Sequence, residues 1–550
     1  MFPKKELAQL VISACHQYNI DTVVISPGSR NAPLTIGFSN HQAIETLSVV
    51  DERSAAFFAM GIAQQKRKPV AIICSSGSAL LNYYPAIAEA FYSNIPLIII
   101  SADRPKHLID IGDGQTIRQE NVFENHILFS ANLVEEENQL ENNSDLLAEA
   151  LQTAITKKGP VHINVPFNEP LYETVADLKE FNFSNVIANE VKQSVNYQKL
   201  SEIWNASTKK MILVGSNFPD AELQNILNRF VEDESVLILT ETTSNLYHPK
   251  FINAIDKLIF PLTETDFLEL QPDLLVTLGG MVVSKKIKQF LRKHQPKQHW
   301  HIDELTAMDT YHCLSEFIQE KPVYFLRKIE TRTNIIKSNY QKDWLIINKD
   351  RNSKHDNYLV DCEYSDLKSF EAILKFIPDN YLVQISNSSI IRYSQLFNLN
   401  STLRVFCNRG TSGIDGSTST AVGAAFADKE PTVFITGDLS FFYDSNGLWN
   451  TNIPKNFRII ILNNDGGGIF RVIPGPLSTN AARYFETPHS LTAEHLAKMY
   501  SFNYTAVSNL EELNIGLKDF YKTSNQPKIM EIFTPKEIND VVLKNYFKNL

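Results

Sequence analysis

The sequence predicts an α/β protein made of three doubly wound domains, each built on a parallel β-sheet. Three observations support this fold class. Short runs of β-branched and aliphatic residues alternate with helical stretches along the whole chain. The runs are continuously apolar, which is typical of strands buried on both faces of a parallel sheet. The length of 550 residues suits three units of roughly 150–200 residues, an ordinary domain size.

The composition is that of a globular protein. With 43% hydrophobic and 21% charged residues, the chain can bury several cores, which excludes a disordered tail, a coiled coil and a collagen-like rod. The net charge of −10 argues against a nucleic acid or an anionic membrane as partner. Five widely spaced cysteines without a CxxC pair indicate a reducing compartment, so we expect a cytoplasmic protein.

The elements can be predicted in chain order. Leu7, Leu10, Val11, Ala14 and Tyr18 recur at helical spacing, which predicts an amphipathic first helix. Twelve apolar runs are then predicted as buried strands: 22–26, 70–74, 97–101, 161–165, 211–214, 236–239, 274–278, 299–302, 381–385, 433–435, 458–462 and 528–533.

Two polar stretches interrupt this alternation. The first opens with Pro166 and Pro170, which end a strand, and continues to about Asn196. The second is the run NKDRNSK at 348–354. These two breaks predict domains at 1–180, 195–345 and 356–550.

The first loop that offers side chains for binding or catalysis is SPGSR at 26–30. Pro27 and Gly28 favour a tight turn, while Ser29 and Arg30 offer donors for a carboxylate or phosphate. A plain strand-to-helix turn with a surface arginine explains the pentapeptide equally well.

An acidic pair, Asp51-Glu52, follows the next strand end and precedes a helical run at 55–62. An acid in this position usually caps the helix. A functional Glu52 would instead be buried enough to share or trade a proton.

A third loop, NRGTSGIDG at 408–416, contains three glycines. Glycine permits close approach of the backbone to a ligand, but an ordinary flexible loop has the same composition. The small residues at 418–427 then predict a tightly packed helix.

The strongest signal is a pair of strand ends. Asp438 in GDLS follows one predicted strand, and Asn464 in NNDGGG follows the next. Their separation is about one strand–helix–strand crossover, so both side chains can reach one edge of a parallel sheet. A carboxylate, an amide oxygen and a glycine-rich backbone supply the hard ligands that suit Mg²⁺ on a diphosphate.

Six motifs together resemble the thiamine-diphosphate (ThDP) enzymes of the decarboxylase superfamily. More narrowly, the chain is similar to the 2-succinyl-5-enolpyruvyl-6-hydroxy-3-cyclohexene-1-carboxylate (SEPHCHC) synthases of menaquinone biosynthesis. The motifs are SPGSRNAPL, DERSAAFFAMG, SADRP, NRGTSGIDG, GDLSFFYDSNGL and NNDGGGIF, in this order along the chain. Acetolactate synthases and pyruvate decarboxylases normally carry GDG in place of GDLS.

The resemblance implies an N-terminal pyrimidine-binding domain, a central Rossmann-like domain and a C-terminal diphosphate-binding domain. It implies ThDP with Mg²⁺, or alternatively Mn²⁺, held by Asp438, Asn464 and the Gly466 carbonyl. Glu52 would reach across a subunit interface to the pyrimidine N1′ and activate the cofactor. The remaining cofactor contacts implied are Ser29, Gly413, Ile414 and Ser440.

The resemblance also implies the substrates. The enzyme would decarboxylate 2-oxoglutarate and add the resulting carbanion to isochorismate in a 1,4-addition. Both substrates are dicarboxylates, which suit planar guanidinium groups. The implied substrate contacts are Arg30, Arg104, Gln115, Lys286, Ser388, Arg392, Arg409, Ile469 and Phe470.

Two positions depart from the family pattern. Lys285-Lys286 stands for a Lys-Arg pair, and Gly114-Gln115 for an Asn-Gln pair, which puts these substrate contacts in doubt. The central domain lacks a glycine fingerprint, so no FAD or NAD is expected there. Because the cofactor would bridge two subunits, a homodimer or homotetramer is expected. The alternatives are an acetolactate-synthase-like enzyme, a non-catalytic relative and a purely structural protein.

Overall fold

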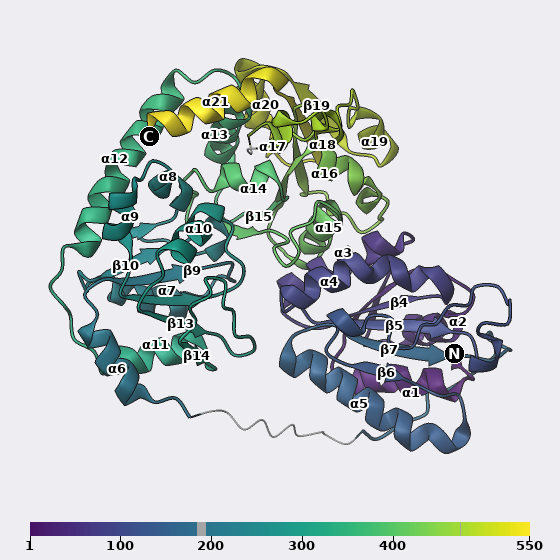
Figure 1. The fold of residues 1–550 in the computed structure, drawn as a ribbon. Coiled ribbons are helices and arrows are strands. Elements are labelled where there is room, and N and C mark those ends of the chain that lie inside the picture. The colour runs from purple at the N-terminus through teal and green to yellow at the C-terminus, as the bar shows by residue number, and fades with distance from the viewer. Residues whose placement is uncertain (184–193, 473–474) are drawn as a thin grey trace.

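The computed structural model describes residues 1–183, 194–472 and 475–550. In this part of the chain, three six-stranded parallel sheets and a small antiparallel pair, β1 (Phe2–Pro3) with β8 (Thr174–Val175), form the strand structure (Figure 1). Helices cover the three large sheets, so the predicted α/β fold class is confirmed. The three-domain boundaries stay a prediction, and residues 184–193 of the first predicted break lie outside the described residues.

The first sheet has the strand order β3-β2-β4-β5-β7-β6. Its strands are β2 (Thr22–Ile25), β3 (Glu45–Ser48), β4 (Val70–Cys74), β5 (Leu97–Asp103), β6 (Ser130–Asn132) and β7 (Val161–Pro166). One face is covered by α1 (Glu6–Gln17), α2 (Ala32–Asn40) and α5 (Leu140–Lys157), the other by α3 (Glu52–Lys66) and α4 (Tyr84–Tyr92). The predicted first helix is confirmed by α1, whose apolar residues lie in the core.

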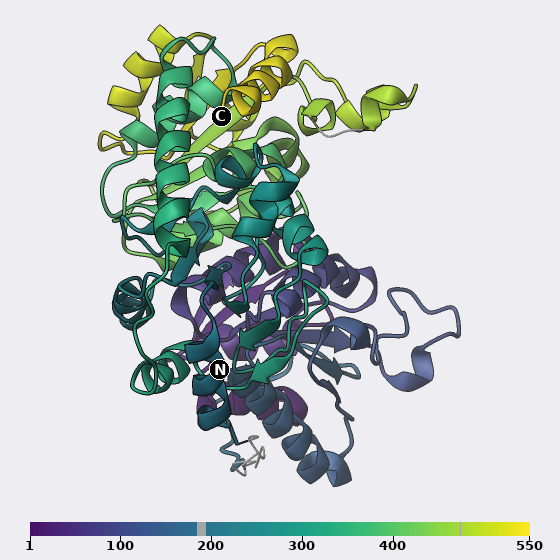
Figure 2. The ribbon, with the colours of Figure 1, turned by 60° about the vertical axis from the view of Figure 1, so that its left-hand side comes forward.

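The third sheet has the order β16-β15-β17-β18-β20-β19, the same relative order as the first sheet. Its strands are β15 (Leu382–Ile385), β16 (Arg404–Phe406), β17 (Thr432–Gly437), β18 (Arg458–Asn463), β19 (Asn503–Val507) and β20 (Lys528–Phe533). Its helices are α13 (Asp366–Phe376), α14 (Ser389–Ser394), α15 (Ser417–Ala427), α16 (Asp438–Tyr443), α17 (Ile469–Val472), α18 (Ala482–Glu486), α19 (Glu494–Met499), α20 (Leu510–Phe520) and α21 (Lys536–Asn549). Figure 2 shows the segment around α18 projecting from this domain.

The middle sheet has a different order, β11-β10-β9-β12-β13-β14. Its strands are β9 (Lys210–Val214), β10 (Val236–Leu239), β11 (Phe251–Ile252), β12 (Leu274–Leu278), β13 (Gln298–Ile302) and β14 (Glu316–Ile318). Its helices are α6 (Tyr197–Ala206), α7 (Ala221–Phe230), α8 (Ile255–Ile259), α9 (Glu264–Leu270), α10 (Lys285–Lys293) and α11 (Pro322–Glu330).

The crevice where strand order reverses, between β9 and β12, is where such sheets bind dinucleotides. Here the two loops bond to each other, since Gly280 N donates to Ser216 O at 2.7 Å. A Cβ at Gly215 would lie 2.0 Å from Gly280 O, so the backbones are in direct contact. The absence of FAD and NAD nevertheless stays a prediction.

The second predicted break is part of a helix that links the middle and third domains, and the boundary drawn from it stays a prediction. The polar run 348–354 lies inside α12 (Tyr340–Val360), a continuous helix of 21 residues. Tyr340 and Trp344 at its start pack into the middle domain, and Leu359 near its end packs into the third. The centre of α12 is polar because this part of the helix is only partly buried where it runs from the middle domain to the third (Figure 1).

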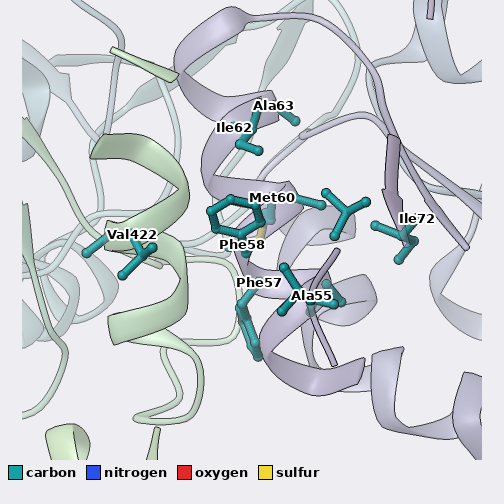
Figure 3. Packing of buried hydrophobic residues seen from close by; sticks show 14 of the residues in the cluster. Ala55, Phe57, Phe58, Met60, Ile62, Ala63, Ile72 and Val422 are labelled. Carbon is teal, nitrogen blue, oxygen red and sulfur yellow. The ribbon is translucent and has the colours of Figure 1, made fainter. Parts of the chain in front are cut away.

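The first and third domains share one hydrophobic core, in which α3 crosses α15 (Figure 3). Phe58 of α3 and Val422 of α15 lie in this core. Glycines bring the helices together: a Cβ at Gly61 would lie 2.2 Å from Thr420 O, and one at Gly423 would lie 2.0 Å from Phe58 O. The helix predicted from small residues is therefore present, and its small side chains permit this close crossing.

Candidate active site

The carboxyl ends of β17 and β18 bring Asp438 and the Asn464 loop together. The two strands are parallel neighbours, with Gly437 opposite Leu462. Asp438 is buried, and its carboxylate accepts from Leu439 N at 2.7 Å and from Gly466 N at 2.9 Å. The structure therefore places two predicted metal-binding side chains and Gly466 at one sheet edge.

The Asn464 side chain has an oxygen suited to a cation. Its Nδ2 donates to Asp366 Oδ2 at 2.8 Å, which fixes the amide. Its Oδ1 is buried and accepts no hydrogen bond from any described residue. An orphaned buried oxygen beside the Asp438 carboxylate fits a hard cation such as Mg²⁺. In the described residues no cluster of three or more His, Cys, Asp or Glu side chains could hold a metal, so a site here would rely on Asp438 together with amide and backbone oxygens.

Asn387 organises the NRGTSGIDG loop. Its Nδ2 donates to Asn408 O at 2.7 Å and to Gly413 O at 2.8 Å, and its Oδ1 accepts from Arg409 Nη1 at 2.7 Å. On the far side of the loop, Ser440 Oγ donates to Ile414 O at 3.0 Å. Of the predicted residues, Arg409 and Gly413 are therefore joined through Asn387, which was not predicted, and Ile414 and Ser440 are joined directly.

A cavity of about 160 Å³ lies between the middle and third domains. The predicted residues that line it are Lys286, Arg392, Asn464, Gly466 and Ile469, together with Lys285. Predicted Phe470 lies beside it, with its ring 5.4 Å from that of Phe485. Predicted Ser388 has a φ of +71° and accepts from Arg392 through its carbonyl.

Arg392, which lines this cavity, and Arg409, which lines a neighbouring one, form a pair of like charges. Burial lowers the pKa of Arg392, and the nearby Arg409 lowers it further. Two neighbouring guanidinium groups that are partly desolvated are stabilised by an anion, above all by a carboxylate. The arrangement is therefore that of an anion-binding site.

Glu52 is the first residue of α3, but it does not cap the helix. The cap is Asp51, whose side chain accepts from Ser54 N at 3.0 Å. Burial raises the pKa of Glu52, and Asp51 raises it further, against the effect of its own backbone N–H. No side chain among those described hydrogen-bonds the Glu52 carboxyl, so this group is free to share a proton with a ligand.

The other predicted residues of the first domain lie at neighbouring strand ends. Ser29 is exposed in the turn after β2. Arg30 is buried and bonds Phe167 O at 2.8 Å; burial lowers its pKa, and Arg104 lowers it further. Gln115 has a φ of +55°, and its carbonyl accepts from Ser76 Oγ at 2.9 Å.

Within one chain the two groups of predicted residues stay apart. The described residues show no hydrogen bond or ion pair between the first-domain group (Ser29, Arg30, Glu52, Arg104, Gln115) and the predicted residues of the middle and third domains. The domains touch beside Glu52, where Asn446 Nδ2 donates to Asp51 at 2.7 Å.

Three supporting acids and amides were not predicted. Besides Asn387, Glu241 accepts from Val283 N at 2.6 Å and Ser284 N at 2.7 Å, which fixes the start of the helix carrying Lys286. Burial raises the pKa of Glu241 to about 7. Glu89 binds the loop at 410–412. Asn387 and Glu241 follow strand ends, a signal that could have found them, whereas Glu89 is a lone acid in an apolar helix.

Comparison with known proteins identifies matches along the chain. Three family models match in order: "Thiamine pyrophosphate enzyme, N-terminal TPP binding domain" at residues 5–128, "Middle domain of thiamine pyrophosphate" at 181–382, and "Thiamine pyrophosphate enzyme, C-terminal TPP binding domain" at 388–532. Thiamine pyrophosphate is another name for ThDP.

Curated relatives match over their full length. Proteins from Flavobacterium johnsoniae and Flavobacterium psychrophilum are 53% and 54% identical to this chain, with 100% of both chains covered in each case. One from Bacteroides thetaiotaomicron is 38% identical, with 100% of this chain and 99% of the relative covered. All three are named 2-succinyl-5-enolpyruvyl-6-hydroxy-3-cyclohexene-1-carboxylate synthase.

Proposed function

Because the chain belongs to the SEPHCHC synthase family of ThDP enzymes, we propose that the residue groups described above carry out that family's reaction. The protein is a ThDP-dependent synthase of menaquinone biosynthesis. It decarboxylates 2-oxoglutarate and joins the remaining four-carbon unit to isochorismate by 1,4-addition, which gives SEPHCHC and CO₂.

The cofactor's diphosphate and metal belong at the edge of the third sheet. Asp438, Asn464 Oδ1 and the Gly466 carbonyl would hold Mg²⁺, with Mn²⁺ as the alternative, and Ser440 would donate to the diphosphate. The orphaned Asn464 Oδ1 supports this assignment. When bound, ThDP supplies the nucleophilic carbon and the electron sink for decarboxylation.

Glu52 would hold and return a proton at its carboxyl group, opposite the pyrimidine N1′ of the cofactor. Its raised pKa supports this role, as does the absence of a hydrogen bond to its carboxyl from any described side chain. Gly413 would accept from the aminopyrimidine through its carbonyl, Ile414 would pack under the cofactor, and Ser29 would lie near it.

One observation carries the substrate assignment: Arg392 lines the same cavity as Asn464 and Gly466, and Arg409 is near enough to lower the pKa of Arg392. Such a pair suits the carboxylates of 2-oxoglutarate and isochorismate. Lys286, Ser388, Ile469 and Phe470 would complete the substrate walls on this side. Arg30, Arg104 and Gln115 would add contacts from the first domain.

A homodimer or homotetramer is proposed, because the first-domain group needs a partner for its half of the site. A second copy of the chain would bring Glu52 to the cofactor of its neighbour. A cytoplasmic location is also proposed. No helix in the described part of the chain is long and apolar enough to cross a membrane.

The test measures CO₂ release from 2-oxoglutarate with ThDP and Mg²⁺, with and without isochorismate, and identifies the product by mass. An adduct that forms only with both substrates supports the proposal. Consumption of pyruvate with formation of acetolactate would instead favour the acetolactate-synthase-like alternative. Absence of turnover with any 2-oxo acid would contradict an enzymatic role.

A further inference from the structure

Glu89 is a buried carboxylate of the first domain that binds the backbone of the third. It lies in the last turn of α4 and is 1% exposed. Oε1 accepts from Gly410 N at 2.6 Å, and Oε2 accepts from Thr411 N at 2.6 Å and Ser412 N at 3.3 Å. Hydroxyl donors complete the set, Thr411 Oγ1 at 2.8 Å and Ser93 Oγ at 2.9 Å.

The charge of Glu89 is compensated by these dipoles alone. No lysine, arginine or histidine among the described residues forms an ion pair with it. Successive N–H groups that point at one anion make a backbone nest, and here the nest includes Ser412 at a φ of +62°. A carboxylate near the C-terminal end of a helix is disfavoured by the helix dipole, and its burial adds a further cost. The hydrogen bonds to the loop therefore offset the cost of burying the Glu89 carboxylate at this end of the helix.

The loop is fixed between two anchors. Glu89 holds the N–H groups of 410–412, and Asn387 holds the flanking carbonyls of Asn408 and Gly413. The close approach of the loop to α4 requires glycine at 410, because a Cβ there would lie 2.4 Å from Glu89 O. The groups assigned to ligands, the Arg409 guanidinium and the Gly413 carbonyl, lie directly beside the anchored residues.

We propose that Glu89 is a positioning residue: it fixes the 410–412 backbone so that Arg409 and the Gly413 carbonyl are held ready for isochorismate and the cofactor. This inference rests on the proposed function for the identity of the ligands. It makes the geometry of the third-domain site depend on a side chain of the first domain in the same chain. Loss of Glu89 should therefore weaken binding more than it slows the chemical step.

The main variant is Glu89→Gln, which keeps the shape but removes the charge and turns an amide N–H toward the nest. Hydrogen exchange of peptides covering 408–416 should become at least tenfold faster, while peptides from β17 stay unchanged. The ThDP dissociation constant and the KM for isochorismate should each rise at least tenfold, with kcat changed less than threefold. Unchanged exchange, or faster exchange with unchanged affinities, would overturn the proposal.

Ser93→Ala and Thr411→Val serve as graded variants, since each removes one hydroxyl donor and leaves the three backbone bonds. We expect each to shift exchange and affinity two- to fivefold in the same direction. If Glu89→Gln does not fold, these two variants decide the matter, and no shift in either would overturn the proposal.

Failure of the proposed function can be distinguished from failure of the inference about Glu89. The exchange and ThDP-binding measurements need no turnover, so they report on Glu89 even if the wild-type protein makes no adduct from 2-oxoglutarate and isochorismate.

Discussion

The first and third sheets have the same strand order, but different side chains follow their equivalent strands. After the second strand of each sheet comes Glu52 in the first domain and Arg409 in the third. After the third strand comes Ser75 in the first domain and Asp438 in the third. Topology thus decides where ligand-binding groups lie, and the loops decide what those groups can bind.

The fourth strands show the same contrast. Arg104 follows β5, whereas Asn464 with its orphaned oxygen follows β18. In the proposed function the first domain therefore offers a proton-sharing acid and cations, and the third offers ligands for a metal together with an anion site. In this proposal each sheet edge supplies a different set of groups, so the reaction needs one edge from a first domain and one from a third domain.

The largest effect is expected from Asp438→Ala, which makes the third sheet resemble the first at this strand end. Removal of a metal ligand costs several kcal/mol, so affinity for ThDP in the presence of Mg²⁺ should fall by at least about 10³-fold. Calorimetric titration of ThDP measures this. The control is Asp428→Asn at the amino end of β17, where the carboxylate pairs with Arg404 at 2.6 Å and accepts from Glu430 N at 2.9 Å. Equal affinity in both variants would contradict the metal assignment.

Glu52→Gln tests the proton-sharing acid of the first sheet. Turnover should fall about 10²–10⁴-fold, the usual contribution of a positioned proton donor or acceptor, while ThDP affinity and thermal stability are kept. Steady-state kinetics and a ThDP titration separate the two. Asp51→Asn is the matched control, because it retains a capping oxygen beside Glu52 and should keep turnover within a few-fold. Near wild-type turnover of Glu52→Gln would refute the role.

Arg409→Ala tests the cation that follows the second strand of the third sheet, the position equivalent to that of Glu52 in the first sheet. A charged hydrogen bond is worth about 1.5–3 kcal/mol, so the KM for isochorismate should rise about 10–150-fold with ThDP affinity unchanged. Arg404→Ala, at the amino end of the same strand β16, should leave this KM unchanged. The assignment fails if the two variants behave alike.

The smallest effect concerns His162, a buried histidine on β7 of the first sheet that bonds Ser101 Oγ at 2.7 Å. Burial lowers its pKa to about 3, so below pH 6.5 the unfolded chain binds a proton that the folded chain does not. Stability therefore falls with acidification, by about 1.4 kcal/mol at pH 5.5.

His162→Gln should remove this part of the pH dependence. Denaturant unfolding at pH 7.5 and 5.5 measures it. An identical loss of stability in the variant and the wild type would show that other groups are responsible.

The sequence predicted the inner strands of every sheet and missed the edges. All twelve apolar runs fall on central strands, four in each of the three large sheets. The edge strands β3, β6, β11, β14, β16 and β19 were not predicted, apart from a strand end implied before Asp51. The central strands are buried and mostly apolar. The edge strands are either largely exposed, such as β19, or only two or three residues long, such as β11 and β16, and so give no apolar run.

The candidate site was predictable where function lies in local motifs. GDLS and NNDGGG placed Asp438 and Asn464 on adjacent strands, and the structure brings them to one edge. Supporting residues were not predictable, because their partners are set by tertiary packing. Glu89 gives no local sign that its partner lies 321 residues further along the chain. The polar run in α12 was not predicted to be helical for a related reason. A polar stretch of helix that runs between two domains has the composition of a loop.

The bond between Glu89 and the 410–412 loop also has a consequence for biosynthesis. At ribosomal rates of about 5–20 residues per second, the 321 residues between Glu89 and Gly410 take roughly 15–65 s to emerge. During this time the Glu89 carboxylate lacks its backbone donors from residues 410–412, and the apolar face of α3 lacks its partner α15. Nascent chains halted before residue 410 should therefore recruit chaperones that recognise exposed apolar surface, and release them once the third domain has been synthesised.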